Sequence, residues 1–398
     1  MINLVQEAYE TRPASIKVIG VGGGGGNTIN SIIDSGYTDI DFIAANTDAQ
    51  ALSMSKATTK IQIGIKTTKG LGAGSNPDFG KRSAEEDMDK ILAAVADADI
   101  VFLTAGLGGG TGSGALPSIA HALREKGILC IAVVTKPFMF EGKKRMRVAE
   151  QALEVIKKEV DTLIVIPNQK LLDVVDQHVS MIDAFSLINN VLGLSVKGIS
   201  DIITKPGHIN VDFADVKTIM KDRGLALMGT ARAKGEKRAQ EAALNAIASP
   251  LLENMDIQGA RGVLLNVTGG PSLTLHEVAQ AASIIYDQSD EDAHIIIGSV
   301  IDENMAEEVS VTVIATGFHH LDQQVVEVPK KDVACKLEEV EPKATAHVKY
   351  EKVASRQEEQ YHRDARHEAA AQDQALLDIN ALDIPTFLRQ QYKTKEDN

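Results

Sequence analysis

Short apolar runs alternate with segments of helical spacing between residues 16 and 168. The runs 16–22 (IKVIGVG), 99–106 (DIVFLTAG) and 161–168 (DTLIVIPN) have the length and apolar character of buried strands. Segment 141–160 places apolar residues three and four positions apart, as an amphipathic helix does. This order predicts an α/β, Rossmann-like domain with a mostly parallel sheet covered on both faces, over residues 14–178. Further strands are expected at 41–48, 61–65 and 128–138, and further helices at 83–98 and 114–127.

The pattern changes in the second half of the chain. Residues 179–203 read as one long helix, so we expect a central helix over 179–204. Four apolar runs follow, and two helical segments separate them. They predict a second, smaller α/β domain over 205–318. The four runs are 225–235, 262–270, 294–300 and 309–317.

The periodic apolar pattern is missing at both ends. Residues 1–13 are expected to be a flexible N-terminus. Residues 319–380 mix both charge signs with Gln and Ala, which predicts a disordered linker. The final segment, 381–398, contains the apolar motif DIPTFLRQQ, Asp383 to Gln391. Its apolar side chains have helical spacing, which suits a short peptide that docks on a partner.

Composition narrows the class of protein. The 398 residues are 44% hydrophobic and 24% charged, with a net charge of -14. Such an acidic chain repels nucleic acid and anionic lipid, so neither is expected as a direct partner. Two cysteines form neither a disulfide framework nor a metal site. The N-terminal residues lack the pattern of a signal peptide, and no apolar run is long enough to span a membrane. We therefore expect a cytoplasmic protein.

The first candidate for chemistry is the glycine run GVGGGGGN, residues 20–27, which follows a predicted strand. Backbone N–H groups in such a run approach phosphate closely, and the next helix adds positive partial charge. Gly20, Gly22 and Gly25 fit G-x-G-x-x-G, so a Rossmann dinucleotide site is one interpretation. Asp41 or Asp48 would then bind the ribose, and the protein would be an NAD-dependent oxidoreductase.

A second run, GGGTGSG at 108–114, also lies between a predicted strand and a helix. Two glycine loops suit a chain of several phosphates held from both sides, whereas a Rossmann site needs one. No hydride-transfer acid/base set accompanies them. We expect Gly110→Val or Gly112→Val to abolish nucleotide binding and to leave the fold intact.

The run GGGTGSG resembles the signature of the tubulin/FtsZ superfamily. The segments NTDAQAL, KGLGAGSNP, VVTKPFMFEGKKR and NVDFADVKTIM resemble its bacterial cell-division branch, and the likeness extends over residues 16–317. It implies a GTPase that polymerises head to tail into filaments of the division ring at midcell. Its cofactors would be GTP/GDP, with Mg²⁺ held mainly by phosphates and water.

The resemblance also implies a set of binding residues. Those expected at the phosphates are Gly23, Gly24, Gly25, Gly26, Asn27, Gly110, Thr111 and Gly112. Those expected elsewhere around the phosphates and the metal are Asn46, Ala73 and Gly74. Those expected at the ribose and its phosphate are Glu141, Arg145 and Asn168. The guanine would lie against Phe185, Asn189 and Asn190. Family members usually carry aspartate at position 190, and an amide has one acceptor oxygen where a carboxylate has two.

The catalytic residues are expected in NVDFADVKTIM. Asp212 and Asp215 are three apart at the start of a predicted helix, so by themselves they read as a helix cap and a first-turn acid. The resemblance implies instead that Asn210, Asp212 and Asp215 enter the pocket of the next subunit and orient the attacking water. Such a head-to-tail contact builds an open filament.

The terminal motif resembles a tail peptide that binds membrane adaptors such as FtsA and ZipA. Adaptor binding is therefore expected through Asp383–Gln391. Two other functions stay open on the sequence alone, the NAD-dependent oxidoreductase and a nucleotide-regulated scaffold without turnover.

Overall fold

The computed structural model describes residues 14–37, 40–172, 179–205, 209, 211–249 and 259–318. The expected N-terminal segment, the linker, the adaptor-binding tail and the expected catalytic residue Asn210 lie outside these residues. Within them, no helix is long and apolar enough to cross a membrane.

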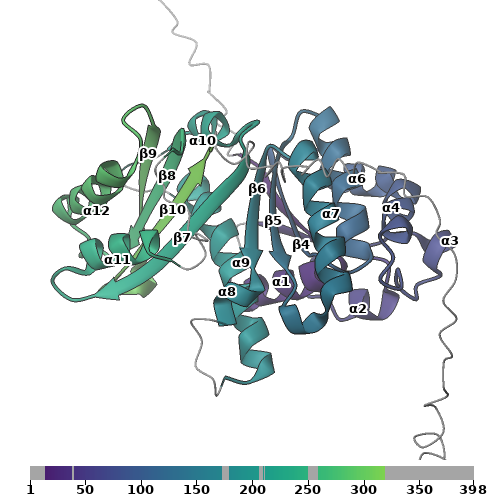
Figure 1. The fold of residues 1–398 in the computed structure, drawn as a ribbon. Coiled ribbons are helices and arrows are strands. Elements are labelled where there is room, and N and C mark those ends of the chain that lie inside the picture. Colours follow the sequence, from purple (N-terminus) through teal and green to yellow (C-terminus); the bar gives the residue numbers. More distant parts are fainter. Residues whose placement is uncertain are drawn as a thin grey trace, which may run out of the picture. The chain divides into compact units, whose positions relative to one another are not determined.

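One sheet runs through the described residues, and Figure 1 shows its strands. The strand order is β3-β2-β1-β4-β5-β6-β7-β10-β8-β9. All neighbouring strands are parallel except β10, which runs antiparallel to β7 and β8. This confirms the mixed α/β class that the alternating pattern predicts. The strands are β1 (Ile16–Val21), β2 (Asp41–Asn46), β3 (Thr59–Gln62), β4 (Ile100–Gly106), β5 (Leu129–Lys136), β6 (Thr162–Pro167), β7 (Gly224–Lys234), β8 (Gly262–Gly269), β9 (His294–Ile301) and β10 (Glu308–Thr316).

Helices cover the two faces of the first six strands. Side chains alternate between the faces along each strand, so Val18 packs with the buried side chains of one face and Ile19 with those of the other. The helices on the Val18 face are α1 (Gly22–Asp34), α2 (Ala49–Ser53), α8 (Asn168–Leu172), α9 (Met181–Thr204) and α10 (Phe213–Met220). Those on the Ile19 face are α4 (Pro77–Glu86), α5 (Met88–Ala94), α6 (Thr111–Glu125) and α7 (Lys143–Glu159). Two short elements, α3 (Ile65–Thr68) and the 3-10 helix η1 (Met139–Glu141), complete this half.

The second half continues the same sheet. Three residues of β6 pair in parallel with β7, from Thr162 opposite Gly224 to Ile164 opposite Ala226. One face of these later strands packs under α11 (Arg238–Ile247) and α12 (Leu275–Gln288). The other face joins the apolar cluster of α9, where Leu264 and Ile314 are buried with the helix residues. The long central helix therefore lies in one continuous core with both halves.

Two local predictions were wrong, for one shared reason. The helix expected over 83–98 is two helices, and the strand expected at 61–65 ends at Gln62. Gly64 has a φ of 68°, and its N–H donates to the Asp87 carboxylate at 2.8 Å. Asp87 also accepts from Lys90 Nζ at 2.6 Å. The side chain of Asp87 thus binds a distant turn at the point where α4 ends and α5 begins.

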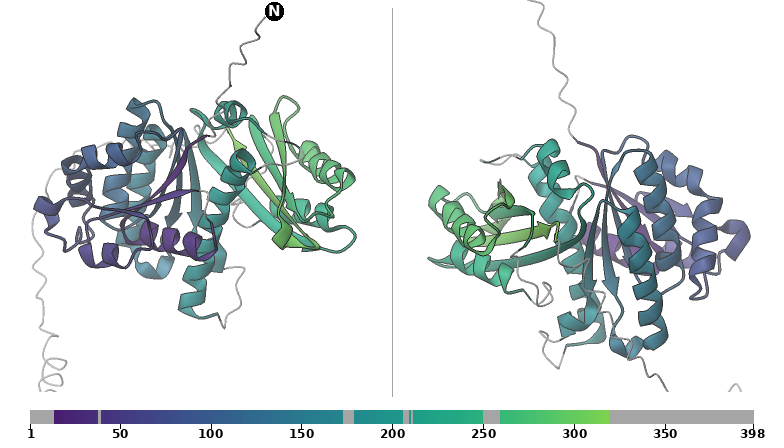
Figure 2. Two further views of the ribbon diagram at one scale, coloured as in Figure 1. Left: turned by 180° about the vertical axis from the view of Figure 1, so that it is seen from behind. Right: turned by 45° about the horizontal axis from the view of Figure 1, so that its top comes forward.

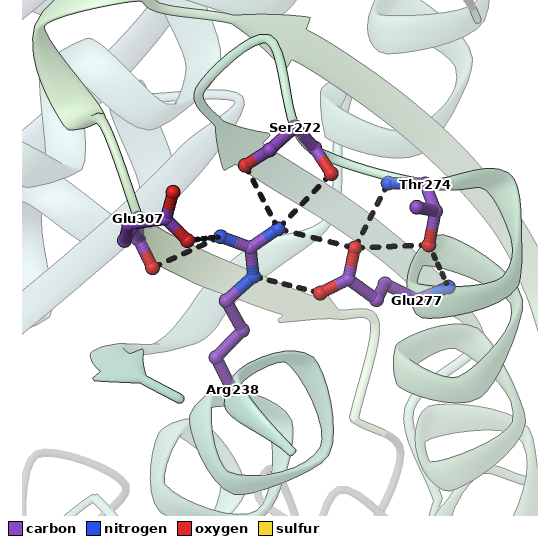
Figure 3. A network of polar contacts seen from close by, with 5 residues as sticks. All are labelled: Arg238, Ser272, Thr274, Glu277 and Glu307. Carbon is purple, nitrogen blue, oxygen red and sulfur yellow. Dashed lines mark hydrogen bonds and ion pairs between the residues drawn. The ribbon is translucent and has the colours of Figure 1, made fainter. Parts of the chain in front are cut away.

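A buried guanidinium fixes the helices of the second half (Figure 3). Arg238, 6% exposed at the start of α11, binds the Glu277 carboxylate of α12, with Nε 2.7 Å from Oε1. It also donates to the Glu307 carbonyl at 3.0 Å and the Ser272 carbonyl at 3.1 Å. Glu277 completes a capping box with Thr274. One side chain therefore ties together two helices and the segment that precedes β10.

Candidate nucleotide site

The first glycine run is helix rather than loop. α1 begins at Gly22, whose φ of 73° makes the turn out of β1, and the remaining glycines form its first turns. A Cβ at Gly25 would lie 2.4 Å from the Thr104 carbonyl oxygen, and one at Gly24 would lie 2.8 Å from the Gly106 nitrogen. The missing side chains thus let α1 pack directly on the backbone of β4. A Cβ at Gly23 would meet nothing within 4 Å.

Close packing explains several glycines of the second run. α6 begins at Thr111, inside the run. A Cβ at Gly114 would lie 1.9 Å from the Pro77 oxygen of α4, and one at Gly110 would lie 2.8 Å from Ala73 Cβ. Only at Gly109, among the run's glycines, would a Cβ meet nothing within 4 Å. Close contact with α4 and its preceding loop therefore accounts for much of this run.

This geometry does not support the expectation that Gly112→Val leaves the fold intact. A Cβ at Gly112 would lie 2.8 Å from the Gly106 carbonyl oxygen, which is backbone and cannot move aside cheaply. Gly110 is equally confined, since its Cβ would also lie 2.8 Å from the Asn76 nitrogen. Bulk at either position strains the packing as well as any ligand. Gly109 and Gly23 line the cavity described next, and added bulk at either position enters open space.

A cavity of about 300 Å³ opens between these two helix N-termini. Its walls come from the carboxyl ends of β1, β4, β5 and β6 and from one side of α9, which is where parallel sheets bind ligands. It brings together eleven residues of the predicted site. These are Gly23, Gly24, Asn27, Gly110, Thr111, Gly112, Glu141, Arg145, Asn168, Phe185 and Asn189.

The other predicted binding residues stand behind or beside this cavity. Gly25 is buried against β4. Asn46, 6% exposed, accepts from the Asp48 N–H at 3.2 Å, and Ala73 lies behind Gly110. Gly74, with a φ of 57°, belongs to the same loop as Ala73. The remaining two, Gly26 and Asn190, also lie outside the lining of this cavity.

Phe185 of α9 lines the cavity, and two further aromatic rings stand beside it. Phe185 is 40% exposed, so it is not a core residue, and its ring meets Phe138 edge to face with centroids 5.5 Å apart. Phe138 is buried and stacks on Phe140 at 4.9 Å. This support holds the open face of Phe185 at a fixed place, ready for a planar ring. Sequence reasoning missed Phe138, although the FMF spacing in 138–140 was a readable signal.

Two polar features suit a sugar phosphate. Glu141 accepts from the Phe138 N–H at 2.9 Å and binds Arg145 Nη1 at 2.5 Å, which fixes a cation at the cavity. Asn168 follows β6 directly and is 5% exposed. Its Oδ1 is buried without a hydrogen-bond partner among the described residues. An unpaired buried acceptor in a cavity wall indicates a ligand that donates to it, such as a ribose hydroxyl.

The cavity offers little to hold a metal ion by itself. Among the residues that the structure describes, no group of three or more His, Cys, Asp or Glu side chains is suitably placed. The carboxylate that lines the cavity, Glu141, is already paired with Arg145. The hydroxyl of Thr111 lies 2.7 Å from that of Thr47 and is an oxygen group at the phosphate end.

Asp212 and Asp215 lie far from this cavity. The cavity is lined by residues that follow β4 and β5, whereas Phe213 and Lys217 of α10 line a groove with Asp99 and Ile128, which precede those strands. Figure 1 shows α10 at the top and α8 at the bottom of the view, toward opposite ends of the central strands. From Phe185 to Thr204 alone, α9 extends about 28 Å along its axis.

The two carboxylates face solvent. Asp212 occupies the N-cap position of α10, yet its side chain accepts no capping hydrogen bond, and Asp215 is exposed in the first turn. The structure therefore gives Asp212 no capping hydrogen bond, whereas Asp215 is the first-turn acid that the spacing predicted.

The aspartates proposed for a dinucleotide site are engaged elsewhere. Asp41 lies opposite Lys17 where β1 and β2 begin. The glycines follow the other, carboxyl end of β1. Asp48 caps α2 through the N–H groups of Gln50 and Ala51. Neither geometry suits the ribose contact of an NAD site.

The fold and the cavity define a nucleotide-binding α/β protein, of the class that binds phosphate groups at helix N-termini. Residues 15–176 match the tubulin/FtsZ family GTPase domain, and residues 224–319 match the C-terminal domain of the FtsZ family. An FtsZ dimer structure from M. jannaschii is 46% identical, with a TM-score of 0.75, over 78% of this chain and 90% of that chain. A point mutant of M. jannaschii FtsZ is 46% identical over 77% of this chain and 92% of that one, with a TM-score of 0.74. CetZ2 from Haloferax volcanii is 22% identical over 76% and 92%, and its TM-score of 0.64 shows a shared fold.

The chain belongs to the tubulin/FtsZ family and is a GTPase. The family membership predicted from the glycine-rich signature is thereby confirmed.

Proposed function

We propose that this GTPase polymerises head to tail and that each active site is completed by the next subunit. The observation that carries this proposal is the separation of the cavity from Asp212 and Asp215. The cavity lies at the carboxyl ends of the strands, and the solvent-exposed carboxylates lie beyond the amino ends. A chain cannot bring its own carboxylates to its own cavity. A second copy stacked along the strand direction can, and M. jannaschii FtsZ has been solved as a dimer.

In this arrangement the two chains have different tasks. The first holds GTP with its helix N-termini, Arg145 and the face of Phe185, and the cavity excludes bulk water from the phosphates. The second places Asp212 and Asp215 at the γ-phosphate, where a carboxylate orients the attacking water. Asn210 is proposed to act beside them. Mg²⁺, carried by the phosphates and water, would neutralise charge there, with the Thr111 hydroxyl as the nearby oxygen group. Hydrolysis then depends on assembly.

Beyond the chemistry, we propose a cytoplasmic role in a division ring at midcell. The segment Asp383–Gln391 would bind adaptors such as FtsA and ZipA, since Phe387 and Leu388 form a dense apolar motif. Truncation before Asp383 should leave GTP turnover and sedimentable polymer unchanged and should abolish adaptor binding. Loss of polymer on truncation would contradict the separation of tail and GTPase.

A mixing experiment tests the shared active site. Asp215→Ala should bind GTP normally and hydrolyse it about a hundredfold more slowly, because one water-orienting group is lost. Gly109→Val should fold and fail to bind GTP, because the side chain enters the open cavity. Each variant alone should be nearly inactive. Mixed, the first supplies a loaded cavity and the second an intact carboxylate, so phosphate release should return. A mixture that stays inactive while co-sedimenting would overturn the proposal.

Protein concentration provides the control. Turnover per chain should rise steeply at the concentration where polymer first sediments with GTP. Turnover that is independent of concentration would show that one chain contains the whole active site. Asp89→Ala should retain normal turnover and serves as the matched substitution, because Asp89 is likewise an exposed acid in the first turn of a helix, α5.

A further inference from the structure

A polar groove of about 390 Å³ continues from the nucleotide cavity along the line where α1 meets α9. Asn27 and Asn189 line both spaces, so the groove begins where the cavity ends. Figure 2 shows α1, in purple, beside the teal helix α9, and the two helices are in contact. The groove is lined by Asn27, Asn30, Ser31, Asp34, Ser35, Ser186, Asn189 and Asn190. A purine whose face lies on Phe185 would direct a polar edge into such a groove.

Two hydroxyls of α1 face the two amides of α9. Thr28 lies beside Asn189, with 3.3 Å between Oγ1 and Oδ1, but it also donates to the Gly24 carbonyl at 3.0 Å. Its single proton is therefore shared. Among the residues that the structure describes, Ser31 has no such competitor, and its hydroxyl donates to Asn190 Oδ1 at 3.1 Å. In this arrangement the oxygen of the Asn190 amide faces Ser31.

Position 190 therefore presents a hydrogen-bond donor to the groove, whereas an aspartate there would present an acceptor. With its oxygen held by Ser31, the Asn190 amide presents its NH₂ group to the groove. An NH₂ group donates to the 6-oxo group of guanine or hypoxanthine. It meets the 6-amino group of adenine donor against donor, which leaves both unpaired. An acceptor that reads the N1–H and 2-amino groups of guanine would instead distinguish guanine from hypoxanthine.

We propose that Ser31 is a specificity-determining positioning residue, which makes Asn190 a hydrogen-bond donor to the 6-oxo group of the purine. The inference rests on the proposed placement of GTP in the cavity. The site accordingly accepts 6-oxopurine triphosphates as a class, excludes 6-aminopurines and gives little weight to the 2-amino group.

Equilibrium binding of GTP, ITP and ATP to the full chain tests this. ITP should bind within about fivefold of GTP, because both offer the 6-oxo acceptor. ATP should bind at least about tenfold more weakly than GTP, because its 6-amino group leaves one hydrogen bond mismatched. In Ser31→Ala the preference for GTP over ATP should fall by about three- to tenfold, because the freed amide can turn its oxygen toward the adenine amine. Ser31→Thr keeps the hydroxyl and should restore the preference.

Asn190→Asp is the complementary variant. Its carboxylate can only accept, so it pairs with the N1–H and 2-amino groups of a shifted base, and ITP should become about tenfold weaker than GTP. Ser35→Ala is the matched control, because Ser35 lines the groove but bonds only the Ser31 carbonyl of its own helix, at 2.9 Å. A purely structural role for Ser31 predicts equal losses for all three nucleotides.

The outcomes separate the two proposals. An ITP penalty beyond fivefold in the unmodified chain, or unchanged ratios in Ser31→Ala, overturns the role of Ser31 and leaves GTP in the cavity. Failure to bind GTP at all overturns both. The expected ratios with restoration by Ser31→Thr support both.

Discussion

Gly114 of α6 lies against Pro77 of α4 so closely that a Cβ at position 114 would be 1.9 Å from the Pro77 carbonyl oxygen. Gly80 is similarly confined, since its Cβ would lie 2.3 Å from the Gly110 oxygen. The two helices therefore meet backbone to backbone. Glycine at these positions allows α6 to begin at the cavity with α4 directly behind it.

This contact makes Gly114→Ala a test of packing. We expect it to lower the free energy of unfolding by about 3 kcal/mol or more, because backbone must shift to admit the methyl group. Gly109→Ala, which enters open space, should change it by less than about 0.5 kcal/mol. Urea unfolding of both variants measures the difference. Equal stabilities would contradict the packing role of the second glycine run.

Asn168 should act through a ribose hydroxyl. Its buried Oδ1 has no hydrogen-bond partner among the described residues. Asn168→Ala therefore breaks no internal hydrogen bond at that atom, and no stability should be lost there. GTP binding should weaken about three- to tenfold, as the loss of one hydrogen bond predicts. The decisive measurement is a cycle with 2′-deoxy-GTP and 3′-deoxy-GTP. For one of these two nucleotides, Asn168→Ala should cause no further loss of affinity. Additive losses with both would place the donor elsewhere on the nucleotide.

Phe185 should contribute stacking energy rather than core packing. Phe185→Ala should weaken GTP binding by about 1–3 kcal/mol, the range for a base on an aromatic face. Phe185→Tyr retains the ring and should bind within a few-fold of the parent chain. Titration calorimetry with GTP measures both, and thermal unfolding serves as the control. A large loss of stability with unchanged affinity would show that the ring is structural.

The ion pair of Arg238 and Glu277 predicts a pH dependence of stability. The hydrogen bond from Arg238 lowers the pKa of the Glu277 carboxyl from 4.5 to about 2. The unfolded chain therefore takes up this proton first as the pH falls. The stabilisation is complete above pH 4.5 and is lost as the pH falls from 4.5 toward 2. At neutral pH the shift corresponds to at most about 3 kcal/mol, to which the Thr274 hydrogen bonds also contribute.

Glu277→Gln should remove that part of the pH dependence. Urea unfolding between pH 6 and pH 3 should give a flatter profile than the parent chain, and the variant should be less stable at pH 6 because Arg238 stays buried without its carboxylate. Glu291→Gln, at an exposed position before β9, is the charge-matched control. Profiles of the same slope in both variants would show that Arg238 does not perturb Glu277.

A second pH-dependent effect, which depends on a histidine, should appear at higher pH. His121 of α6 lies 2.8 Å from Glu159 of α7, and this hydrogen bond raises the pKa of the imidazole. A raised pKa stabilises the fold below pH 6.5, and the effect is lost as the pH rises through the folded value. His121→Gln should abolish the fall in melting temperature over that interval. An unchanged fall would assign it to another group.

Much of the fold follows from the sequence because its causes are local. The alternation of Val18 and Ile19 between the two faces of β1 is fixed by the two-residue period of a strand. The same reasoning located most other strands and the long helix. It also predicted that the two glycine runs bring helix N-termini to one edge of a parallel sheet, and α1 and α6 do begin at one cavity there.

Only the tertiary structure decided what the individual glycines do. Gly25 and Gly114 look alike in sequence to Gly23 and Gly109, yet the first pair is pressed against backbone and the second faces open space. Likewise, Asp87 ended a helix by binding the N–H of Gly64 across the fold. Contacts between residues distant along the chain depend on how whole elements pack, and no local period encodes them. The separation of Phe185 from Asp212 by the length of α9 is of the same kind, and it makes a site shared between two chains physically reasonable.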